Sequence, residues 1–497
     1  MGTRRLVLAI DQSTQGTKAM LLDAHGSLVC RRDVAHKQLV DAHGWVSHDP
    51  EEIYGNVITA SKQVIAESGV DAKDIEGIGI TNQRETTVAW DATTGRPICD
   101  AIVWHCVRAR EICEQLSNRE GLADEVHSCT GLALSPYYPA SKMAWVLRNV
   151  DAAVALQDHG DLRLGTIDAW LIWKLTGGRE FRCDYSNASR TQLFDIERLE
   201  WAPHLCEEFG IQSESLPQVT DSDALFGMTD LERVLPRQVP IHAVLGDSHA
   251  ALFGQGCVCA GRAKATYGTG SSVMLNTGHR LVRSSHGLAT SLAWRMRGRT
   301  DYVLEGNVNY TGAVISWLRD DLGLISSVGE VESLCGMATK DDGLYLVPAF
   351  TGLGAPYWES GARGMLCGMS RTTGRPEVVR AAIECIAHQI ADIVDAMCKD
   401  FDAPLDVLRA DGGPTANAYL MQCQADFLGC HVMVPAIQEM SGVGVGRVAA
   451  LALGILDETP EDEARAAYAP REPPGRVGRA RAGWAHAVEC TIGLGRV

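Results

Sequence analysis

The stretch Val244–Leu275, VLGDSHAALFGQGCVCAGRAKATYGTGSSVML, decides the fold that we predict for this chain. Asp247 follows a short apolar run and a glycine, where a buried strand would reach the surface. Ligands of open α/β sheets bind at such strand ends. Further along, Gly268–Gly270 forms a turn between two strand-like runs, typical of loops whose backbone N–H groups bind phosphate. The stretch therefore predicts a base and a phosphate loop that lie close together.

A similar order of apolar strand, polar turn and apolar strand occurs at the N-terminus. Leu6–Ile10 is a continuous apolar run, Asp11–Lys18 is a polar turn, and Ala19–Leu22 resumes an apolar strand. Thr14–Gly16 and Thr269–Ser271 are related turns in related hairpins. An internal repeat of this kind favours two similar lobes, each of which gives one loop to a shared cleft.

Composition narrows the class of protein. A chain of 497 residues fits about three domains or two large lobes. Its net charge of -17 argues against a nucleic-acid or an anionic membrane partner, and no apolar run approaches transmembrane length. Sixteen cysteines without a C-x-x-C pair favour reduced thiols. We therefore expect a soluble cytoplasmic protein.

Strand and helix patterns alternate along the chain. Asp49 and Pro50 have the N-cap and first-turn positions of a helix that Gly69 would end. Residues 75–80 then form a strand pattern, and Pro376–Met397 has the clearest helical spacing of apolar residues. This alternation predicts an α/β fold with mixed sheets.

Arg84 and Glu85 are adjacent, so on a regular strand they would point to opposite faces. They can share a ligand only from a loop. A surface turn with a solvated ion pair is the alternative.

Trp104 and Tyr137 also have two interpretations, as core rings or as the wall of a pocket, and large rings belong more often to the core.

Several nucleotide and metal motifs do not occur in the sequence. It contains no G-x-x-x-x-G-K-[ST], no H-R-D with D-F-G, no strand followed by G-x-G-x-x-G and no H-x-x-x-H. P-loop, protein-kinase, Rossmann and zinc-hydrolase interpretations are therefore disfavoured.

Five short motifs occur in one order along the chain. They are Asp11–Thr14, Asn82–Thr87, Gly246–Asp247, Tyr267–Gly270 and Asp411–Gly413. Together they resemble the FGGY carbohydrate kinases, and among these the members that phosphorylate glycerol. The resemblance implies the two-lobed α/β fold shared with actin, hexokinase and the Hsp70 ATPase domain, with a mixed sheet in each lobe. It divides the chain into an N-terminal lobe, 1–251, and a C-terminal lobe, 252–497.

The resemblance also implies roles for individual residues. ATP and Mg²⁺ would be the cofactors, with Asp247 as the catalytic base and with Asp11 and Asp247 near the metal through water. The nucleotide would contact Thr14, Gln15, Lys18, Thr269, Gly312, Ser316, Gly413 and Asn417. The polyol would contact Arg84, Glu85, Trp104, Tyr137, Asp247, Ser248 and Ser272. The family further implies a homodimer or a higher homo-oligomer.

Departures from the family pattern leave the acceptor open. The first loop has Ser13 where the family usually has glycine, and Gln15–Gly16 where its glycerol-phosphorylating members have hydroxyl residues. Ser248 replaces a glutamine, and Ser272 replaces a phenylalanine that packs against the glycerol backbone. Both serines predict a larger and more hydrophilic pocket.

Glycerol, converted to glycerol 3-phosphate, is the predicted acceptor on the number of matching residues. Erythritol, threitol, a pentitol or a ketose is the alternative. A non-catalytic ATP-dependent switch of the same fold is a remote third interpretation. Retention of Asp247, Arg84 and Glu85 favours an enzyme, because a switch needs phosphate loops but no polyol ligands.

Overall fold

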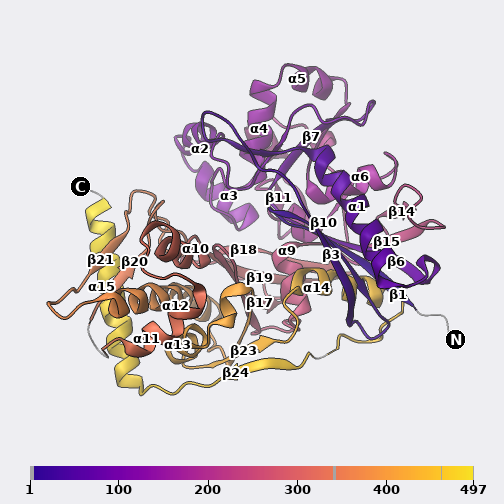
Figure 1. Ribbon diagram of the computed structural model, residues 1–497. Coiled ribbons are helices and arrows are strands. Elements are labelled where there is room, and N and C mark those ends of the chain that lie inside the picture. Colours follow the sequence, from indigo (N-terminus) through magenta and orange to yellow (C-terminus); the bar gives the residue numbers. More distant parts are fainter. Residues whose placement is uncertain (1–4, 340–342, 461, 496–497) are drawn as a thin grey trace.

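The computed structural model describes residues 5–339, 343–460 and 462–495 and has two lobes, each built on a mixed β-sheet (Figure 1). The early, indigo and purple part of the chain forms one lobe, and most of the orange and yellow part forms the other. No helix among these residues is long and apolar enough to cross a membrane.

The sheet of the first lobe has six strands in the order β14-β15-β6-β1-β2-β3. In that order, the strands span Gly227–Thr229, Val239–Gly246, Ile75–Asn82, Leu6–Gln12, Gly16–Leu22 and Leu28–Ala35. β1, β6 and β15 run parallel, while β1, β2 and β3 form an antiparallel meander. Every residue of β1 is buried, because helices cover both faces of this part of the sheet.

The sheet of the second lobe has seven strands in the order β18-β19-β17-β16-β22-β23-β24. They span Ala289–Met296, Arg299–Val308, Ser271–Gly278, Ala263–Tyr267, Val407–Asp411, His431–Pro435 and Ala464–Tyr468. β16 and β17 form an antiparallel hairpin, β19 pairs antiparallel with β17, and β16, β22 and β23 run parallel. Each lobe therefore contains an antiparallel hairpin whose first strand also joins a parallel set, and the predicted repeat of two hairpins is confirmed.

The smaller sheets surround these two. A five-stranded sheet has the order β4-β5-β8-β7-β9, with bounds Leu39–Val40, Val46–His48, Ala101–Ile102, Thr87–Asp91 and Leu162–Thr166. Three two-stranded sheets pair β10 (Arg182–Asp184) with β13 (Gln218–Thr220), β11 (Phe194–Asp195) with β12 (Glu200–Trp201), and β20 (Tyr345–Val347) with β21 (Met365–Cys367).

Two predicted helices are confirmed, the first of them at both ends. α1, Pro50–Ser68, begins with the Asp49 side chain accepting the Glu51 N–H, and Gly69 ends it in the left-handed conformation. α12, Arg375–Phe401, extends the helix predicted over Pro376–Met397 by one residue before it and by four after it. Its apolar face belongs to the core of the second lobe, beside β17 and β19.

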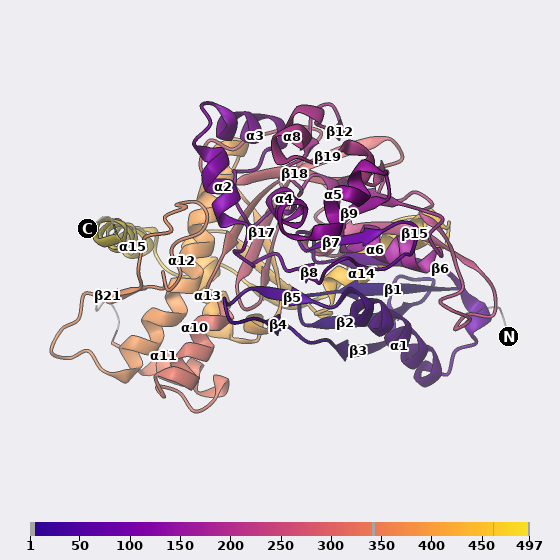
Figure 2. The ribbon, with the colours of Figure 1, turned by 90° about the horizontal axis from the view of Figure 1, so that it is seen from above.

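The remaining helices surround the sheets of both lobes (Figure 2). They are α2 (Arg110–Ser117), α3 (Leu122–Thr130), α4 (Pro139–Asn149), α5 (Asp151–Asp158), α6 (Ile167–Leu175), α7 (Tyr185–Ala188), α8 (Pro203–Phe209), α9 (Asp247–Gly254), α10 (Gly312–Ser316), α11 (Val331–Met337), α13 (Ala418–Leu428), α14 (Met440–Ala452) and α15 (Pro474–Gly495).

α14 lies late in the sequence but packs on the sheet of the first lobe, against β1, β6 and β15 (Figure 1). It also crosses α9, the helix that begins at Asp247. The two helices approach closely at Gly444, where an added Cβ would lie 1.9 Å from the carbonyl oxygen of Ala250. This contact requires glycine, since the neighbouring atom belongs to the backbone and cannot rotate away.

We therefore expect Gly444→Ala to separate α14 from α9 and to lower the free energy of unfolding by about 1–3 kcal/mol, the usual cost of overpacking a core. Urea unfolding followed by tryptophan fluorescence measures the change. Gly55→Ala is the matched control, because Gly55 lies within α1 and an added Cβ there meets nothing within 4 Å. Equal midpoints for the two variants would contradict the packing argument.

Candidate active site

The candidate site forms where the parallel strands of the first lobe end. Asp11 lies near the end of β1, Arg84 follows the end of β6, and Asp247 follows the end of β15. The registers Asp11↔Thr81 and Gly246↔Asn82 align these three ends at one edge of the sheet. This is the edge at which open α/β sheets bind ligands.

Arg84 lies in the loop between β6 and β7, as predicted for a residue that cooperates with Glu85. Both side chains are buried, at 3% and 4% exposed, so the alternative of a solvated surface turn is wrong. The Arg84 guanidinium donates from Nη2 to Glu305 Oε1 (2.7 Å) and from Nη1 to Glu305 Oε2 (3.0 Å). Its Nε lies 3.1 Å from Asp247 Oδ1. The predicted base therefore contacts an arginine of the first lobe that is itself paired with a glutamate of the second lobe.

A second arginine completes this buried network. Arg190 donates from Nε to Glu85 Oε1 (2.8 Å), and its Nη1 lies 3.0 Å from Glu305 Oε2. Burial opposes the ionised form of Glu305, but Arg190 and Arg84 hold the pKa of this carboxyl well below its usual value. Burial likewise opposes the charge of Arg84, yet Glu305, Glu85 and Asp247 raise its pKa well above the ordinary value. Each charge is thus compensated by its neighbours.

Asp247 is the first residue of α9, and 35% of its side chain is exposed. Its Oδ1 accepts the N–H of Ser248 (2.6 Å). Desolvation in the cleft raises the pKa of Asp247 above its ordinary value, while the Arg84 charge lowers it. The carboxylate is accessible and is oriented by a backbone donor and a guanidinium, which suits a group that accepts a proton.

His249 lies in the first turn of α9, beside Arg84. Its Nδ1 is 3.4 Å from Arg84 Nη1, and its Nε2 is 3.4 Å from Ser291 Oγ. Burial, with the Arg84 charge as the next cause, holds the pKa of His249 well below its ordinary value. The ring is therefore neutral at pH 7, and its Nδ1 can accept a hydrogen bond from the guanidinium.

Asp11 and Lys18 face each other across the first hairpin, where they are register partners. Lys18 Nζ lies 3.9 Å from Asp11 Oδ2 and donates to Glu439 Oε2 (2.7 Å), the residue before α14. Arg31 also binds Glu439. Burial raises the pKa of Asp11 to about 6, and the nearby Asp247 charge adds to this rise. The predicted phosphate-binding lysine is thus paired with an acid that the sequence patterns did not indicate.

The first loop contacts the predicted acceptor wall. Trp104 Nε1 donates to Thr14 Oγ1 (3.0 Å), and the Trp104 and Tyr137 rings lie edge to face with centroids 5.4 Å apart. Both rings are partly exposed, which fits a pocket wall better than a core. The backbone oxygens of Thr14 and Gln15 bind His36, and the side chain of Gln15 is exposed.

The second glycine turn is joined to the start of α10. Thr269 is exposed, and its carbonyl accepts the N–H groups of Thr311 and Ala313, while Gly312 donates to Gly268 (2.9 Å). Gly312 therefore lies directly beside the turn, as its predicted nucleotide role requires. Ser316, at the end of α10, is exposed and further from the turn.

The end of β22 meets the same turn. Gly412 has φ +96°, and an added Cβ there would lie 1.9 Å from the Tyr267 carbonyl oxygen, so only glycine fits. Gly413 is exposed, and its neighbour Pro414 approaches Gly312. Asn417 caps α13, because its Oδ1 accepts the Leu420 N–H (2.9 Å). Its side-chain oxygen is thus occupied, although its amide nitrogen remains as a donor.

Ser272 lies on β17 beside the charge network. Its Oγ donates to Glu305 Oε1 (3.2 Å). Lys264 Nζ donates to Thr266 Oγ1 (3.1 Å) and to the Oγ of Ser272 (3.4 Å). Burial lowers the pKa of Lys264, against the attraction of Asp411 and Glu305.

Models of both domains of one family match the chain. The N-terminal domain of the FGGY family of carbohydrate kinases matches residues 6–254, and its C-terminal domain matches residues 263–453. The chain belongs to the FGGY family of carbohydrate kinases.

Individual relatives of this FGGY kinase share nearly its whole length. The chain is 46% identical over 462 residues to glycerol kinase 1 of Thermotoga maritima, covering 93% of this chain and 94% of that one. It is 43% identical over 494 residues to glycerol kinase of Shewanella woodyi, covering 99% of each chain.

Among solved structures, Plasmodium falciparum glycerol kinase with ADP is 33% identical, with a TM-score of 0.92 over 98% of each chain. A ligand-bound xylulose kinase from Lactobacillus acidophilus has a TM-score of 0.88 at 20% identity, covering 99% of this chain and 98% of that one, which shows a common fold. The predicted two-lobed α/β fold is therefore confirmed.

Four residues of the FGGY kinase site received no role from the sequence patterns: Glu305, Arg190, Lys264 and His249. The sequence did contain a signal for two of them, since Glu305 and Lys264 are single charges within strand-like apolar runs. A charge inside a buried strand has to be paired, and such residues are candidates for a site.

We expect Asp11→Asn to stabilise the ligand-free protein at pH 7. The pKa of Asp11 rises on folding from 3.8 to about 6, so the folded state binds the proton more tightly and loses stability as the pH rises between these values. Removing the charge should raise the free energy of unfolding by up to about 3 kcal/mol at pH 7 and by little near pH 4.

Urea unfolding of the wild type and Asp11→Asn at pH 5 and pH 7.5, without divalent cations, measures this difference. The exposed Asp321→Asn is the control. A stability difference between wild type and Asp11→Asn that does not grow with pH would show that burial of Asp11 carries no such cost.

Proposed function

We propose that this FGGY kinase transfers the γ-phosphoryl group of ATP to a primary hydroxyl of glycerol and forms glycerol 3-phosphate. One observation carries the proposal: an accessible acid, Asp247, lies at a strand end beside Arg84, in a site that also receives strand β17 with its glycine turn. The glycerol kinases that share 43–46% identity with the chain support the choice of acceptor.

The residues fit the demands of phosphoryl transfer, which needs positioning and electrostatic stabilisation more than covalent chemistry. Asp247 accepts the proton of the attacking hydroxyl, while the oxygen of that hydroxyl bonds to the γ-phosphorus and ADP leaves. Arg84 and Glu85 bind the acceptor hydroxyls, and Trp104 and Tyr137 form the wall behind its carbons. Ser248 and Ser272 complete the pocket.

We assign the nucleotide to both glycine turns. Thr14, Gln15 and Lys18 contact the phosphates from the first lobe, and Thr269 does so from the second. Gly312, Ser316, Gly413 and Asn417 surround the ribose and adenine. Gly312 and the turn are hydrogen-bonded neighbours, which supports a shared role.

Mg²⁺ fits the acids of this site. The Asp247 charge disfavours the ionisation of Asp11 and raises its pKa, and a cation held by these acids would relieve this repulsion. No group of three ligating side chains occurs among the described residues, which suits an ion that keeps several waters and uses few carboxylates. When bound, Mg²⁺ would neutralise charge on the transferred phosphoryl group.

We retain the division into lobes 1–251 and 252–497, with the addition that α14 packs on the first lobe.

We also propose a cytoplasmic enzyme, because its sixteen cysteines are free thiols and suit a reducing compartment. A homodimer or a higher homo-oligomer is the assembly that the family resemblance favours.

We expect Asp247→Asn to bind ATP with near-normal affinity and to lose turnover with glycerol by roughly 10²–10⁴, the usual effect of removing a general base. Coupled detection of ADP gives the rate, and nucleotide-induced thermal stabilisation gives binding. Asp124→Asn is the matched control, because Asp124 is an exposed carboxylate on α3.

Two outcomes would count against the proposal. Near-normal turnover by Asp247→Asn would remove Asp247 from the mechanism. ATP hydrolysis that no added polyol accelerates in the wild type would favour a nucleotide-driven switch over a kinase.

A further inference from the structure

The sheet of the second lobe presents a polar row to the active site. Register partners in antiparallel strands share a face, and Thr266, Ser272 and Asn307 are partners across β16, β17 and β19. Residues two apart on a strand also share a face, so Lys264 and Glu305 lie on the same side. The face that carries the Arg84 network therefore continues along β19 to Asn307.

Ser272 is connected to the predicted base through a chain of side-chain contacts. The Arg84 guanidinium lies 3.1 Å from Asp247 Oδ1 and 2.7 Å from Glu305 Oε1, and Ser272 Oγ is 3.2 Å from the same Glu305 oxygen. Glu305 and Asn307 are two residues apart on β19, so the polar row continues from the Arg84 network by one strand repeat, about 7 Å. A longer carbon chain covers more of this row.

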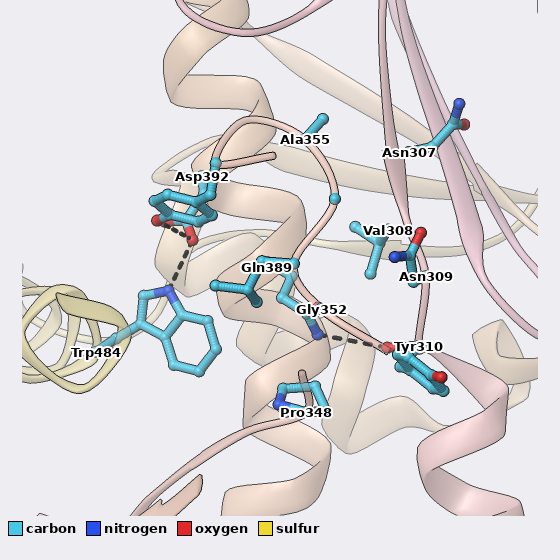
Figure 3. Close-up of a pocket in the computed structure, with 13 residues that line it drawn as sticks. Asn307, Val308, Asn309, Tyr310, Pro348, Gly352, Ala355, Gln389, Asp392 and Trp484 are labelled. Atoms are coloured by element: carbon cyan, nitrogen blue, oxygen red, sulfur yellow. Dashed lines mark hydrogen bonds between the residues drawn. The ribbon is translucent and has the colours of Figure 1, made fainter. Parts of the chain in front are cut away.

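Asn307 is the register partner of Ser272 and is only partly buried. Its side-chain amide makes no hydrogen bond to any residue within the described ranges of the chain. Asn307 is one of the residues that line a small cavity beside β19, and Figure 3 shows its amide turned away from two others, Gln389 and Trp484. The amide is thus free for a ligand on the face that Ser272 shares.

We propose that Ser272 and Asn307 form a polar subsite for a hydroxyl group on an acceptor carbon beyond the third. The acceptor class of this site then includes linear polyols of four or five carbons besides glycerol. The inference rests on the proposed function, since the subsite extends the same acceptor pocket.

The chemistry of the two residues supports this class of acceptor. An amide offers two donors and an acceptor, and a serine hydroxyl donates and accepts, so both can bind a secondary or primary alcohol. A site that is built to bond a hydroxyl discriminates against an analogue that lacks it, because its polar groups are then unpaired. Lys264 donates to Ser272 Oγ and Glu305 accepts from it, which fixes the position of this hydroxyl.

The test compares acceptors within each variant. We would measure kcat/KM by coupled ADP detection for glycerol, erythritol and ribitol in the wild type, Ser272→Ala and Asn307→Ala. The subsite predicts that the ratio of kcat/KM for erythritol or ribitol to that for glycerol falls about tenfold in each variant, as expected for the loss of one hydrogen bond. Asn118→Ala, an exposed asparagine that follows α2, is the matched control and should leave this ratio unchanged.

The outcomes separate the subsite from the proposed function. If glycerol leads the wild-type panel by a hundredfold and neither variant changes the ratio, the subsite is wrong and glycerol phosphorylation stands. If no polyol accelerates ATP consumption, the proposed function fails. Calorimetric binding of erythritol then tests the subsite by itself, and equal affinities of the wild type and Asn307→Ala would overturn it.

Discussion

The ion pair between Arg84 and Glu305 is the interaction on which the site depends, because it joins a loop of the first lobe to a strand of the second. Both groups are buried, and burial of isolated charges is costly unless their geometry is good and their remaining hydrogen-bonding groups are satisfied. The bidentate contact supplies this geometry, and Arg190 adds a second positive charge beside Glu305. Within the described part of the chain, Arg84 Nε and both terminal nitrogens of Arg190 make no hydrogen bond, so only part of the condition is met. The position of Arg84, and with it the orientation of Asp247, is therefore coupled to the relative position of the two lobes.

The acids at the strand ends are less well compensated than this pair. Burial raises the pKa of Asp11 and of Asp411 to about 6 and raises that of Asp247 as well. The nearest cation to Asp11, Lys18, is shared with Glu439. Positive charge favours the ionised form of a buried carboxyl, so a ligand that brings a divalent cation fits such a site. Functional acids of this kind reduce the stability of the free protein, and this cost is usual at active sites.

The sequence predicted those helices and hairpins that are determined by residues close together in the chain. The N-cap Asp49 and the stop at Gly69 identified α1, and the paired apolar runs around Thr14 and Thr269 identified both hairpins. Arg84 was predicted in a loop, but its burial was not, because its partner Glu305 lies 221 residues away in the sequence. Periodicity reports which face of an element is apolar, whereas a buried ion pair between lobes depends on how the elements assemble. The family resemblance supplied site residues that patterns alone did not, yet it gave no role to Lys264 or His249.

Reaction and acceptor choice depend on different parts of this architecture. The groups that we propose to act on the transferred phosphoryl group come from strand ends and glycine turns, whose backbone is fixed by the parallel registers and by contacts such as that of Gly412 with Tyr267. The groups that we propose for the far end of the acceptor are alternate side chains of β17 and β19, which can change without any change in the backbone. Kinases named for different acceptors can therefore share one fold. Ser272 and Asn307 lie at such positions, so the acceptor of this kinase has to be inferred from the side chains on that face and not from the fold.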